Sequence, residues 1–283
     1  MKPLVSVIIP VRNGAATVGE VLDALAAQEW PTDRMQVIVA DNGSTDGTGE
    51  VARARGATVV VEDQVFSAAA ARNRGIDAAE GDILLFVDCD CVMEPGWVSA
   101  LVAALEGENA DLAGGAVRSR LGRRPLLGHY EDLSYARQEA RIREHGVSGT
   151  GNLAVRRAVF DAVGPFRADL RQGEDDEFCQ RVVAAGFVIA FAPGAVVYRA
   201  PVESVAALLR RQYRSGRTEV ALLAAGGQLV RAPGSSYLSR KRAYVARVLR
   251  AQGVPWFHRI GVIVLNLAAS VAQWLGRRSG GNR

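Results

Sequence analysis

The sequence is poor in cysteine and histidine, and it lacks a long uninterrupted apolar run. Its 283 residues include three cysteines and three histidines. So few cysteines exclude a disulfide-stabilised scaffold and favour free thiols in a reducing compartment. No stretch reaches the roughly 18 consecutive apolar residues that indicate a membrane-spanning helix, and the N-terminus has no signal-peptide pattern. We therefore expect a cytoplasmic protein.

The sequence also lacks a phosphate-binding P-loop and internal repeats. No G-x-x-x-x-G-K pattern occurs, which excludes a P-loop protein. Hydrophobic residues make up 49% and charged residues 23% of the chain, proportions that exclude a disordered, collagen-like or coiled-coil protein. The length allows one or two globular domains.

Charge is distributed unevenly along the chain. Residues 199–283 contain 15 lysines and arginines but only Glu203 and Glu219 as acids, a formal charge of +13. The first 198 residues carry 19 basic and 28 acidic side chains, a formal charge of −9. A basic segment after an acidic body predicts an anionic partner, either a membrane surface or a nucleic acid.

Strand and helix patterns alternate through the first 118 residues. Short β-branched runs alternate with stretches in which apolar residues recur at helical spacing. The predicted strands are 5–10, 36–41, 57–63 and 82–90, and the predicted helices are 15–28, 45–55, 67–79 and 95–105. This alternation predicts βαβ units in a mostly parallel sheet, whose ligands bind beyond the carboxyl ends of the strands.

The rest of the chain is less regular. We predict helices over 126–146, 154–163 and 175–185, and short strands over 187–193 and 195–199. Basic amphipathic helices are predicted over 203–225 and 237–252, followed by a more apolar helix over 255–276. These patterns predict a domain over residues 1–200, with halves of 1–118 and 119–200, and a helical extension over 201–283.

Two aspartates follow the fourth predicted strand in the run LLFVDCDC (84–91). In an extended strand Asp88 and Asp90 lie on the same face, where their carboxylates can bind Mg²⁺ or Mn²⁺ and, through the metal, a diphosphate. A solvated acidic turn is the alternative for so short a pattern. Cys89 and Cys91 face the other way in this register, so they are predicted as small core residues rather than metal ligands.

Polar, turn-forming clusters follow the first two strands, in IIPVRNG (8–14) and VIVADNGSTDGT (37–48). Asp41 stands at a strand end, where it can accept hydrogen bonds from a base or a ribose. Thr45 or Asp46 can cap the next helix, whose N-terminus is electropositive. Ordinary turn chemistry is the alternative explanation for either cluster alone.

Four consecutive acids open a predicted helix in GEDDEF (173–178). Acids favour a helix N-terminus, so capping is the simpler explanation. Four of them repel one another, which capping alone does not require. At least one carboxylate is therefore a candidate general base.

Together these motifs resemble the inverting family 2 glycosyltransferases of the GT-A fold. Six patterns occur in the family's order: PVRN, VADNGSTDGT, ARNRG, VDCDC, GTGNLAVRR and GEDDEF. The resemblance covers about residues 4–217. It implies a nucleotide-sugar-dependent transferase with a Rossmann-like, mostly parallel α/β sheet flanked by helices, and it implies little about the chain beyond residue 217.

The resemblance also implies roles for individual residues. Asp41 corresponds to the acid that holds the base of the nucleotide. Asp90 corresponds to the second acid of the D-x-D motif, which coordinates the metal together with Asp88. Glu174 and Asp175 correspond to the family's acidic pair, in which Asp175 is the base. The other positions implied to line the nucleotide-sugar site are Pro10, Arg12, Asn13, Asp63, Arg72, Gly151 and Asn152.

The chain departs from the family after the last short strand. Many relatives have a histidine there that helps to bind metal or diphosphate, whereas this chain has Tyr198, Arg199 and Ala200. Arg199 is therefore expected to contact the diphosphate, with Mg²⁺ or Mn²⁺ held more weakly. The mechanism implied is a single displacement, in which Asp175 takes the proton of an acceptor hydroxyl and the hydroxyl attacks the anomeric carbon with inversion.

The last predicted helix contains the apolar run IGVIVLNLAASVAQWL (260–275), flanked by arginines. Such a run spans about 24 Å of helix, less than the roughly 30 Å of a bilayer's hydrocarbon core. We therefore expect an anchor that lies on an anionic membrane, at the inner face of the cell membrane. A helix buried in a core or a dimer, and a spanning helix, are the alternatives.

The expected function is transfer of a sugar from a UDP-, GDP- or dTDP-sugar to a hydroxyl of a polysaccharide, a lipid-linked glycan or another glycan, as in cell-envelope polysaccharide synthesis. A nucleotidyltransferase is one alternative, disfavoured because VRNGAAT (11–17) has a single arginine and a single glycine. A non-catalytic nucleotide-binding assembly subunit is another. No nucleic-acid partner is expected, because the basic helices lack interleaved aromatics that could stack bases.

Overall fold

The computed structural model describes residues 2–120, 125–135, 138–170, 172–224 and 237–280. The chain divides into two compact units. Unit 1 comprises Met1–Val117 and Gln138–Arg199, and unit 2 comprises Arg118–Arg137 and Ala200–Arg283. Residues 118–137 therefore group with the C-terminal helices, whereas the sequence pattern places them in the first domain.

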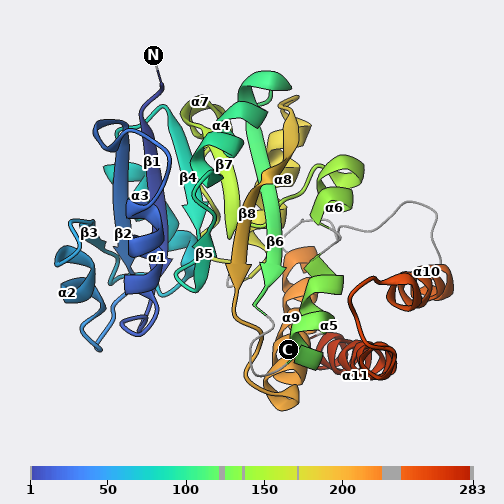
Figure 1. The fold of residues 1–283 in the computed structure, drawn as a ribbon. Coiled ribbons are helices and arrows are strands. Elements are labelled where there is room, and N and C mark those ends of the chain that lie inside the picture. The colour runs from blue at the N-terminus through green and yellow to red at the C-terminus, as the bar shows by residue number, and fades with distance from the viewer. Residues whose placement is uncertain (1, 121–124, 136–137, 171, 225–236, 281–283) are drawn as a thin grey trace. The chain divides into compact units, whose positions relative to one another are not determined.

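The described part of unit 1 is built on an eight-stranded mixed sheet with the order β3-β2-β1-β4-β7-β6-β8-β5 (Figure 1). The strands are β1 (Val5–Val11), β2 (Met35–Asp41), β3 (Thr58–Val61), β4 (Ile83–Val87), β5 (Cys91–Met93), β6 (Leu112–Ser119), β7 (Asn152–Arg156) and β8 (Ile189–Arg199). β3, β2, β1 and β4 are parallel, and the pairs β4–β7, β7–β6 and β8–β5 are antiparallel. The predicted α/β sheet is confirmed, with its parallel part in the first four strands of this order.

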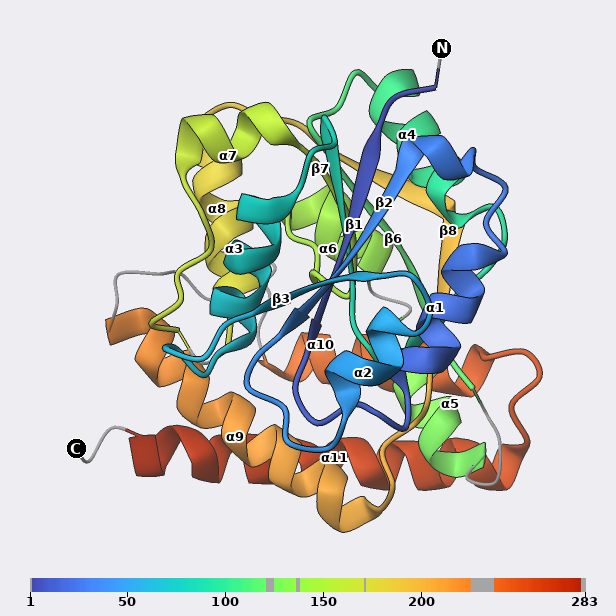
Figure 2. The ribbon, with the colours of Figure 1, turned by 90° about the vertical axis from the view of Figure 1, so that its left-hand side faces the viewer.

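Helices cover both faces of the sheet (Figure 2). The helices of unit 1 are α1 (Val18–Ala26), α2 (Thr48–Arg53), α3 (Ala68–Ala78), α4 (Trp97–Gly107), α6 (Gln138–His145), α7 (Arg157–Val163) and α8 (Glu174–Ala184), and a 3-10 turn, η1, spans Thr32–Arg34. Val7 and Ile9 are buried with α1 and α4, whereas Ile8 is buried on the opposite face with α3, α7 and α8. Because both faces are covered, the central strands are apolar throughout.

Several elements differ from the sequence prediction. β7 and α7 divide a segment that is predicted as a helix from Ala154 onward, because a short strand that joins a helix directly has no turn residues to mark its end. β8 runs through Pro193 and Gly194, where two strands are predicted. β4 ends at Val87, so the D-x-D aspartates lie in a turn, which the Cys91 N–H closes on the Asp88 carbonyl at 3.0 Å.

The described part of unit 2 consists of α5 (Pro125–Tyr135), α9 (Val205–Ala224), α10 (Tyr237–Arg250) and α11 (Trp256–Gly280). The polar helix predicted over 126–146 is thus two helices, α5 and α6, and residues 136–137 between them lie outside the described part. Apolar side chains from the four helices form a separate core, which includes Leu127, Tyr130, Leu208, Tyr244, Val248, Val262 and Leu265.

Glycines allow α9 and α11 to touch backbone to backbone within unit 2 (Figure 2). A Cβ on Gly216 would lie 2.0 Å from the Gln273 carbonyl oxygen, and one on Gly276 would lie 2.0 Å from the Tyr213 carbonyl oxygen. Beside this contact, Gln273 Nε2 donates a hydrogen bond to Glu219 Oε1 at 2.6 Å. Any larger side chain at either glycine would push the two helices apart.

Candidate active site

Buried aromatic rings place the two acidic motifs next to each other. Phe86 on β4 precedes the D-x-D turn, and Phe178 lies in the first turns of α8. Phe166 contacts both, with ring centroids 5.5 Å from Phe86 and 4.5 Å from Phe178. All three side chains are buried. Because close-packed rings leave little freedom, this cluster holds the N-terminus of α8 beside the carboxyl end of β4.

Arg72, from α3, joins the two motifs directly. Its Nη1 donates to Glu174 Oε1 at 2.8 Å, and its Nη2 donates to Asp88 Oδ1 at 3.2 Å. The Arg72 side chain is only 6% exposed, so the loss of either carboxylate would leave its buried charge less fully compensated. Burial and the charge of Asp175 raise the pKa of Glu174, while Arg72 opposes that rise. The structure thus brings three predicted site residues into contact.

Arg199 contacts the other side of the D-x-D pair. Its Nε donates to Asp90 Oδ2 at 2.9 Å, and its Nη1 lies 3.5 Å from Asp88 Oδ2. Arg199 ends β8, and the pairing of β8 with β5 places it opposite Cys91. Two guanidinium groups, from Arg72 and Arg199, therefore face three carboxylates.

The D-x-D turn offers ligands for a divalent cation. One carboxylate oxygen from each of Asp88 and Asp90 and the sulfur of Cys91 lie within 4.8 Å of one another. Carboxylate oxygens are the ligands that Mg²⁺ and Mn²⁺ prefer. Burial and the charge of Asp88 raise the pKa of the Cys91 thiol, and a protonated thiol is a poor ligand. The two aspartates are therefore suitable ligands for a divalent cation. Such a cation would compensate their negative charge together with Arg199.

The four acids that open α8 do not share one environment. Three form ion pairs with arginines of α3, α6 and α8 itself: Glu174–Arg72, Asp176–Arg141 and Glu177–Arg181. Among the described residues, Asp175 is the member of the four without an ion pair. Its Oδ1 accepts the Asp176 N–H at 2.9 Å. Burial and the neighbouring Asp175 raise the pKa of Asp176 to about 6. The acids are therefore distributed among separate contacts, and within the described part of the chain the Asp175 carboxylate has no arginine partner.

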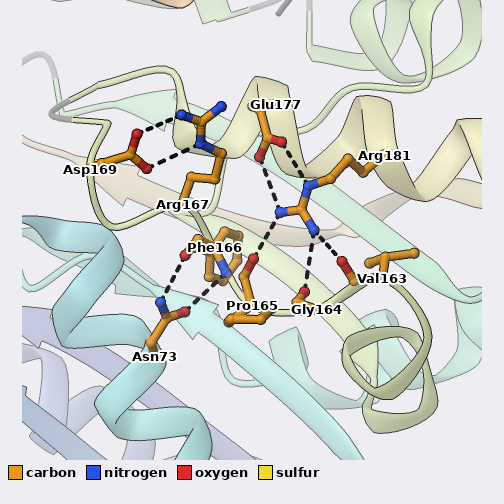
Figure 3. A network of polar contacts seen from close by, with 9 residues as sticks. All are labelled: Asn73, Val163, Gly164, Pro165, Phe166, Arg167, Asp169, Glu177 and Arg181. Carbon is orange, nitrogen blue, oxygen red and sulfur yellow. Dashed lines mark hydrogen bonds and ion pairs between the residues drawn. The ribbon is translucent and has the colours of Figure 1, made fainter. Parts of the chain in front are cut away.

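Arg181 ties α8 to the loop after α7 (Figure 3). Its Nε and Nη2 lie 2.7 and 3.1 Å from the two Glu177 oxygens, and Nη2 also donates to the Pro165 carbonyl at 2.8 Å. On the other side of the loop, Asn73 Nδ2 donates to the Phe166 carbonyl at 2.8 Å, and Asn73 Oδ1 accepts the Phe166 N–H at 3.0 Å. These bonds hold the loop between α3 and α8.

The glycines before β7 lie close to both candidate aspartates. A Cβ on Gly151 would lie 2.9 Å from Asp88 Oδ2, and one on Gly149 would lie 3.5 Å from Asp175 Oδ2. A side chain at residue 151 would therefore displace Asp88. The predicted position Gly151 is thus next to the metal-binding candidate.

Asn152, the other predicted position in this segment, is fully buried. Its Oδ1 accepts a hydrogen bond from Trp97 Nε1 at 2.8 Å, and its Nδ2 donates to the Ala195 carbonyl at 2.8 Å and to the Ala116 carbonyl at 2.9 Å. The amide therefore connects β7 with α4, β6 and β8. Its contact with a sugar stays a prediction.

Asn13 joins the loops that follow β1 and β2. Its φ is 51°, a left-handed conformation that asparagine tolerates. The Asn13 N–H donates to Ser44 Oγ at 2.8 Å, and Asn13 Oδ1 accepts the Thr45 N–H at 2.9 Å. Asp46 Oδ2 accepts the Ala15 N–H at 3.0 Å. The N-cap residue of α2 is Gly47, which makes no side-chain capping bond, and the Oδ1 of the preceding Asp46 accepts the Thr48 N–H at 3.1 Å.

Pro10 and Asp41 lie at the carboxyl ends of the central strands. The pairing of β1 with β4 ends at Ile8, before Pro10, which has no N–H to donate. Asp41 ends β2 and is buried, with Oδ1 accepting the Ser44 N–H at 2.8 Å. β1 and β4 thus separate before Pro10, whereas β2 stays paired with β1 and β3 as far as Asp41.

Arg12 and Asp63 complete the predicted positions. The Arg12 guanidinium lies 4.5 Å from the ring centroid of Phe66, and Asp63 Oδ1 accepts a bond from Gln64 Nε2 at 2.8 Å. Asn42 Nδ2 donates to the carbonyls of Glu62 and Val65, which fixes the loop that carries Phe66. The sequence prediction overlooked Phe66, although an aromatic residue in a polar loop after a strand was a usable signal.

Comparison with known proteins settles the family. The model of glycosyl transferase family 2 matches residues 6–164. The chain belongs to this family. Its relatives include glycosyltransferase AglE of Haloferax volcanii, 34% identical over 77% of this chain and 73% of the relative. The pre-mycofactocin glycosyltransferase of Mycobacterium tuberculosis is 28% identical over 68% of this chain but only 42% of its own length.

Solved structures confirm the fold of this family 2 glycosyltransferase. The mannosyltransferase PcManGT from Pyrobaculum calidifontis, in complex with GDP-Man and Mn²⁺, superposes with a TM-score of 0.70 at 20% identity, covering 97% of this chain and 88% of that one. TarS of S. aureus, residues 1–349 in complex with UDP-GlcNAc, gives a TM-score of 0.56 at 18% identity, covering 95% of this chain and 73% of that one.

Proposed function

We propose that this glycosyltransferase transfers a sugar from a nucleoside-diphosphate sugar to an acceptor hydroxyl, with inversion and with the assistance of Mg²⁺ or Mn²⁺. The proposal depends above all on one observation, the connection of the D-x-D turn to the start of α8 through the two ion pairs of Arg72. This connection puts acids suited to a metal-bound diphosphate and an acid suited to a base in one cluster.

The donor would bind along the carboxyl ends of β1, β2 and β3. Asp41 is the candidate acceptor for hydrogen bonds from the base, and Arg12, Asn13 and Asp63 lie on the surrounding loops. The descriptions of the solved relatives name GDP-Man and UDP-GlcNAc as bound donors, which supports a nucleotide sugar here. UDP, GDP and dTDP are the candidate nucleotides.

Asp88 and Asp90 would hold the cation, and the two arginines would act beside it. A bound divalent ion supplies positive charge that stabilises the leaving diphosphate. Arg199 is near enough to Asp90 to exchange that carboxylate for a phosphate oxygen once the donor is present. Arg72 would keep Asp88 in position through its bond at 3.2 Å.

Asp175 would act as the general base. Among the described residues it is the acid of the α8 cluster without an ion pair, so its carboxylate is available to take the proton of an acceptor hydroxyl. Its paired neighbour Glu174 would hold the start of α8 through Arg72. General-base catalysis contributes about 10²–10⁴ in rate. The hydroxyl oxygen then attacks the anomeric carbon as the bond to the diphosphate breaks, which inverts that centre.

The acceptor class belongs to the proposal as well. A hydroxyl of a growing polysaccharide or of a lipid-linked glycan is proposed, consistent with a role in building cell-envelope glycans. We place the enzyme in the cytoplasm, peripheral on the inner face of the cell membrane.

A thermal-shift experiment tests the donor site. UDP, GDP and dTDP are each added with and without Mn²⁺ to the native protein, to Asp90→Asn and to the control Asp77→Asn, which changes an exposed acid of α3. A ligand at about 100 times its Kd stabilises a protein by about 2.7 kcal/mol. We expect one nucleotide to raise the Tm of the native and Asp77→Asn proteins only with Mn²⁺, and not to raise that of Asp90→Asn. If none of the three nucleotides raises the Tm of the native protein, the proposal is overturned.

Turnover of Asp175→Asn tests the base. The asparagine retains an oxygen for the Asp176 N–H, so the start of α8 should be preserved. We expect donor binding equal to that of the native protein and a kcat lower by about 10²–10⁴. A kcat within a few-fold of the native value would assign the base to another residue.

A further inference from the structure

One face of α11 is apolar and exposed along nearly the whole helix. The exposed residues recur at intervals of three or four, as one face of a helix requires. We define them as the apolar stripe: Trp256, Ile260, Val264, Leu267, Val271 and Trp274, each with between 45% and 71% of its surface exposed. A continuous stripe of this kind marks an interaction surface.

The opposite face of α11 is used inside unit 2. Val262 and Leu265 are buried in the core of the unit. Asn266 and Ser270 contact α10 within the unit, because Lys241 Nζ donates to Asn266 Oδ1 and to Ser270 Oγ, each at 2.5 Å. The residues that make the helix less apolar in sequence therefore do not interrupt the apolar stripe.

Tryptophans end the apolar stripe, and an arginine lies at one of its ends. Trp256 and Trp274 lie at its two ends, and the Arg278 guanidinium lies 4.1 Å from the Trp274 ring centroid. Arginines are exposed on the helices of unit 2: Arg210, Arg214, Arg217, Arg242, Arg250 and Arg278. The sequence from residue 200 onward contains only two acids, Glu203 and Glu219. An apolar stripe that ends in tryptophans, on a unit with many exposed arginines, complements the boundary between acyl chains and anionic headgroups.

We propose that the apolar stripe binds the surface of an anionic lipid bilayer, with α11 lying in the interface rather than crossing it. By length and composition the 25 residues of α11, with a mean hydropathy of 1.4 over the most apolar window, are sufficient to cross a membrane. A crossing helix would take Lys241, bound to the middle of α11, and Glu219, bound to Gln273, into the hydrocarbon. Charged groups there are costly, whereas a helix lying flat buries only the stripe.

Cosedimentation of the full chain with vesicles tests this proposal without any catalytic readout. The vesicles contain either phosphatidylcholine alone or equal parts of phosphatidylcholine and phosphatidylglycerol. We expect strong binding to the anionic vesicles, weaker binding to the neutral ones, and full release of bound protein by alkaline carbonate. The variant Ile260→Ser/Val264→Ser/Val271→Ser should bind anionic vesicles more than about tenfold less tightly.

A matched control and a depth measurement complete the test. Val183→Ser/Val188→Ser alters two valines of unit 1 that are 44% and 48% exposed, and it should bind vesicles like the native protein. Lipids labelled with bromine near the headgroup should quench the fluorescence of Trp256 and Trp274 equally. The variants Trp256→Phe and Trp274→Phe separate the two fluorescence signals. Retention after carbonate would show a crossing helix, and a dimer in solution that the triple variant abolishes would assign the stripe to a second copy. Either of these results overturns the proposal, and so does native protein that stays in the supernatant. None of the three outcomes changes the expectation for donor binding.

Discussion

The guanidinium group of Arg199 donates to Asp90 Oδ2 at 2.9 Å, on the very carboxylate that the D-x-D motif offers to a metal. A cation and an arginine at this position compensate the same negative charge. If Asp88 and Asp90 hold a cation as proposed, the affinity for that cation should depend on the position of Arg199 at the end of β8.

Arg199→Ala should increase the affinity for Mn²⁺ in the absence of nucleotide by about tenfold, because two adjacent carboxylates lose a neighbouring cation in a partly solvated site. With donor present, kcat should fall, because a charge beside the proposed diphosphate is missing. A titration followed by the electron paramagnetic resonance of free Mn²⁺ measures the first effect. Arg55→Ala, which removes a surface pair with Asp23, is the control, and equal Mn²⁺ affinity in Arg199→Ala and the native protein would contradict the prediction.

The titration of Asp176 should lower the free energy of unfolding of the native protein as pH rises. Asp176→Asn should remove this pH dependence. The pKa of Asp176 is raised from 3.8 to about 6 in the fold by burial and by Asp175, despite the ion pair with Arg141. The folded state therefore holds this proton more tightly than the unfolded state, so the contribution of Asp176 to stability falls as pH rises from about 4 to about 6. Above that window the contribution stays constant.

Urea unfolding at a series of pH values across this window checks the sign. The free energy of unfolding of the native protein, minus that of Asp176→Asn, should decrease as pH rises. Glu174 also has a raised pKa but is present in both proteins, so the subtraction removes most of its effect. A difference that is flat or rises with pH would show that the Arg141 pair dominates over burial.

Arg181→Met should destabilise unit 1 far more than Arg167→Ala, although both arginines contact an acid in Figure 3. Arg181 pairs with Glu177, whose side chain is 11% exposed, and also donates to three loop carbonyls. Arg167 pairs with the exposed Asp169. We expect a loss of about 2–3 kcal/mol for Arg181→Met and little change for Arg167→Ala. Chemical denaturation measures the free energy of unfolding of both variants. An equal decrease in the two would contradict the prediction.

Gly216→Ala should destabilise unit 2 although alanine favours helix formation. The added Cβ would lie 2.0 Å from a backbone oxygen of α11, which cannot move as a flexible side chain can. Overpacking typically costs about 1–3 kcal/mol, which outweighs a gain in helix propensity of about 1 kcal/mol. Gly107→Ala, in a helical position with open space around its Cβ, isolates the propensity effect. In thermal unfolding, the Tm of Gly216→Ala should be lower than that of the native protein, and the Tm of Gly107→Ala should not.

The parallel half of the sheet was predictable because each strand is apolar on both faces and is separated from the next by a periodic helix. β7 and α7 were not, since the five residues Asn152–Arg156 pass directly into a helix. The D-x-D aspartates stay candidates for a metal site, but their predicted placement on a strand face was wrong, because a hydrogen bond to the Asp88 carbonyl closes a turn there. Local hydrogen bonds of this kind leave little trace in a hydrophobicity pattern.

The partners of the site residues were less accessible than the residues themselves. Arg72 and Glu174 are 102 positions apart in sequence, and no periodicity relates them. Glu177 and Arg181, by contrast, stand four residues apart on one helix, a spacing that predicts contact. The sequence spacing could therefore predict the pair of Glu177 with Arg181. That Asp175 has no ion pair among the described residues could be seen only in the folded structure.

The bonds that Asn13 and Asp46 make between the loops after β1 and β2 have a consequence for the thermodynamics of donor binding. Loops that already hold each other in the folded protein have lost their conformational entropy before any ligand arrives, so ordering them adds no cost to association. Asn13→Ala would remove the bond between Asn13 Oδ1 and the Thr45 N–H and so transfer part of that cost to the binding step. The change would appear in calorimetry as a less favourable entropy of nucleotide binding.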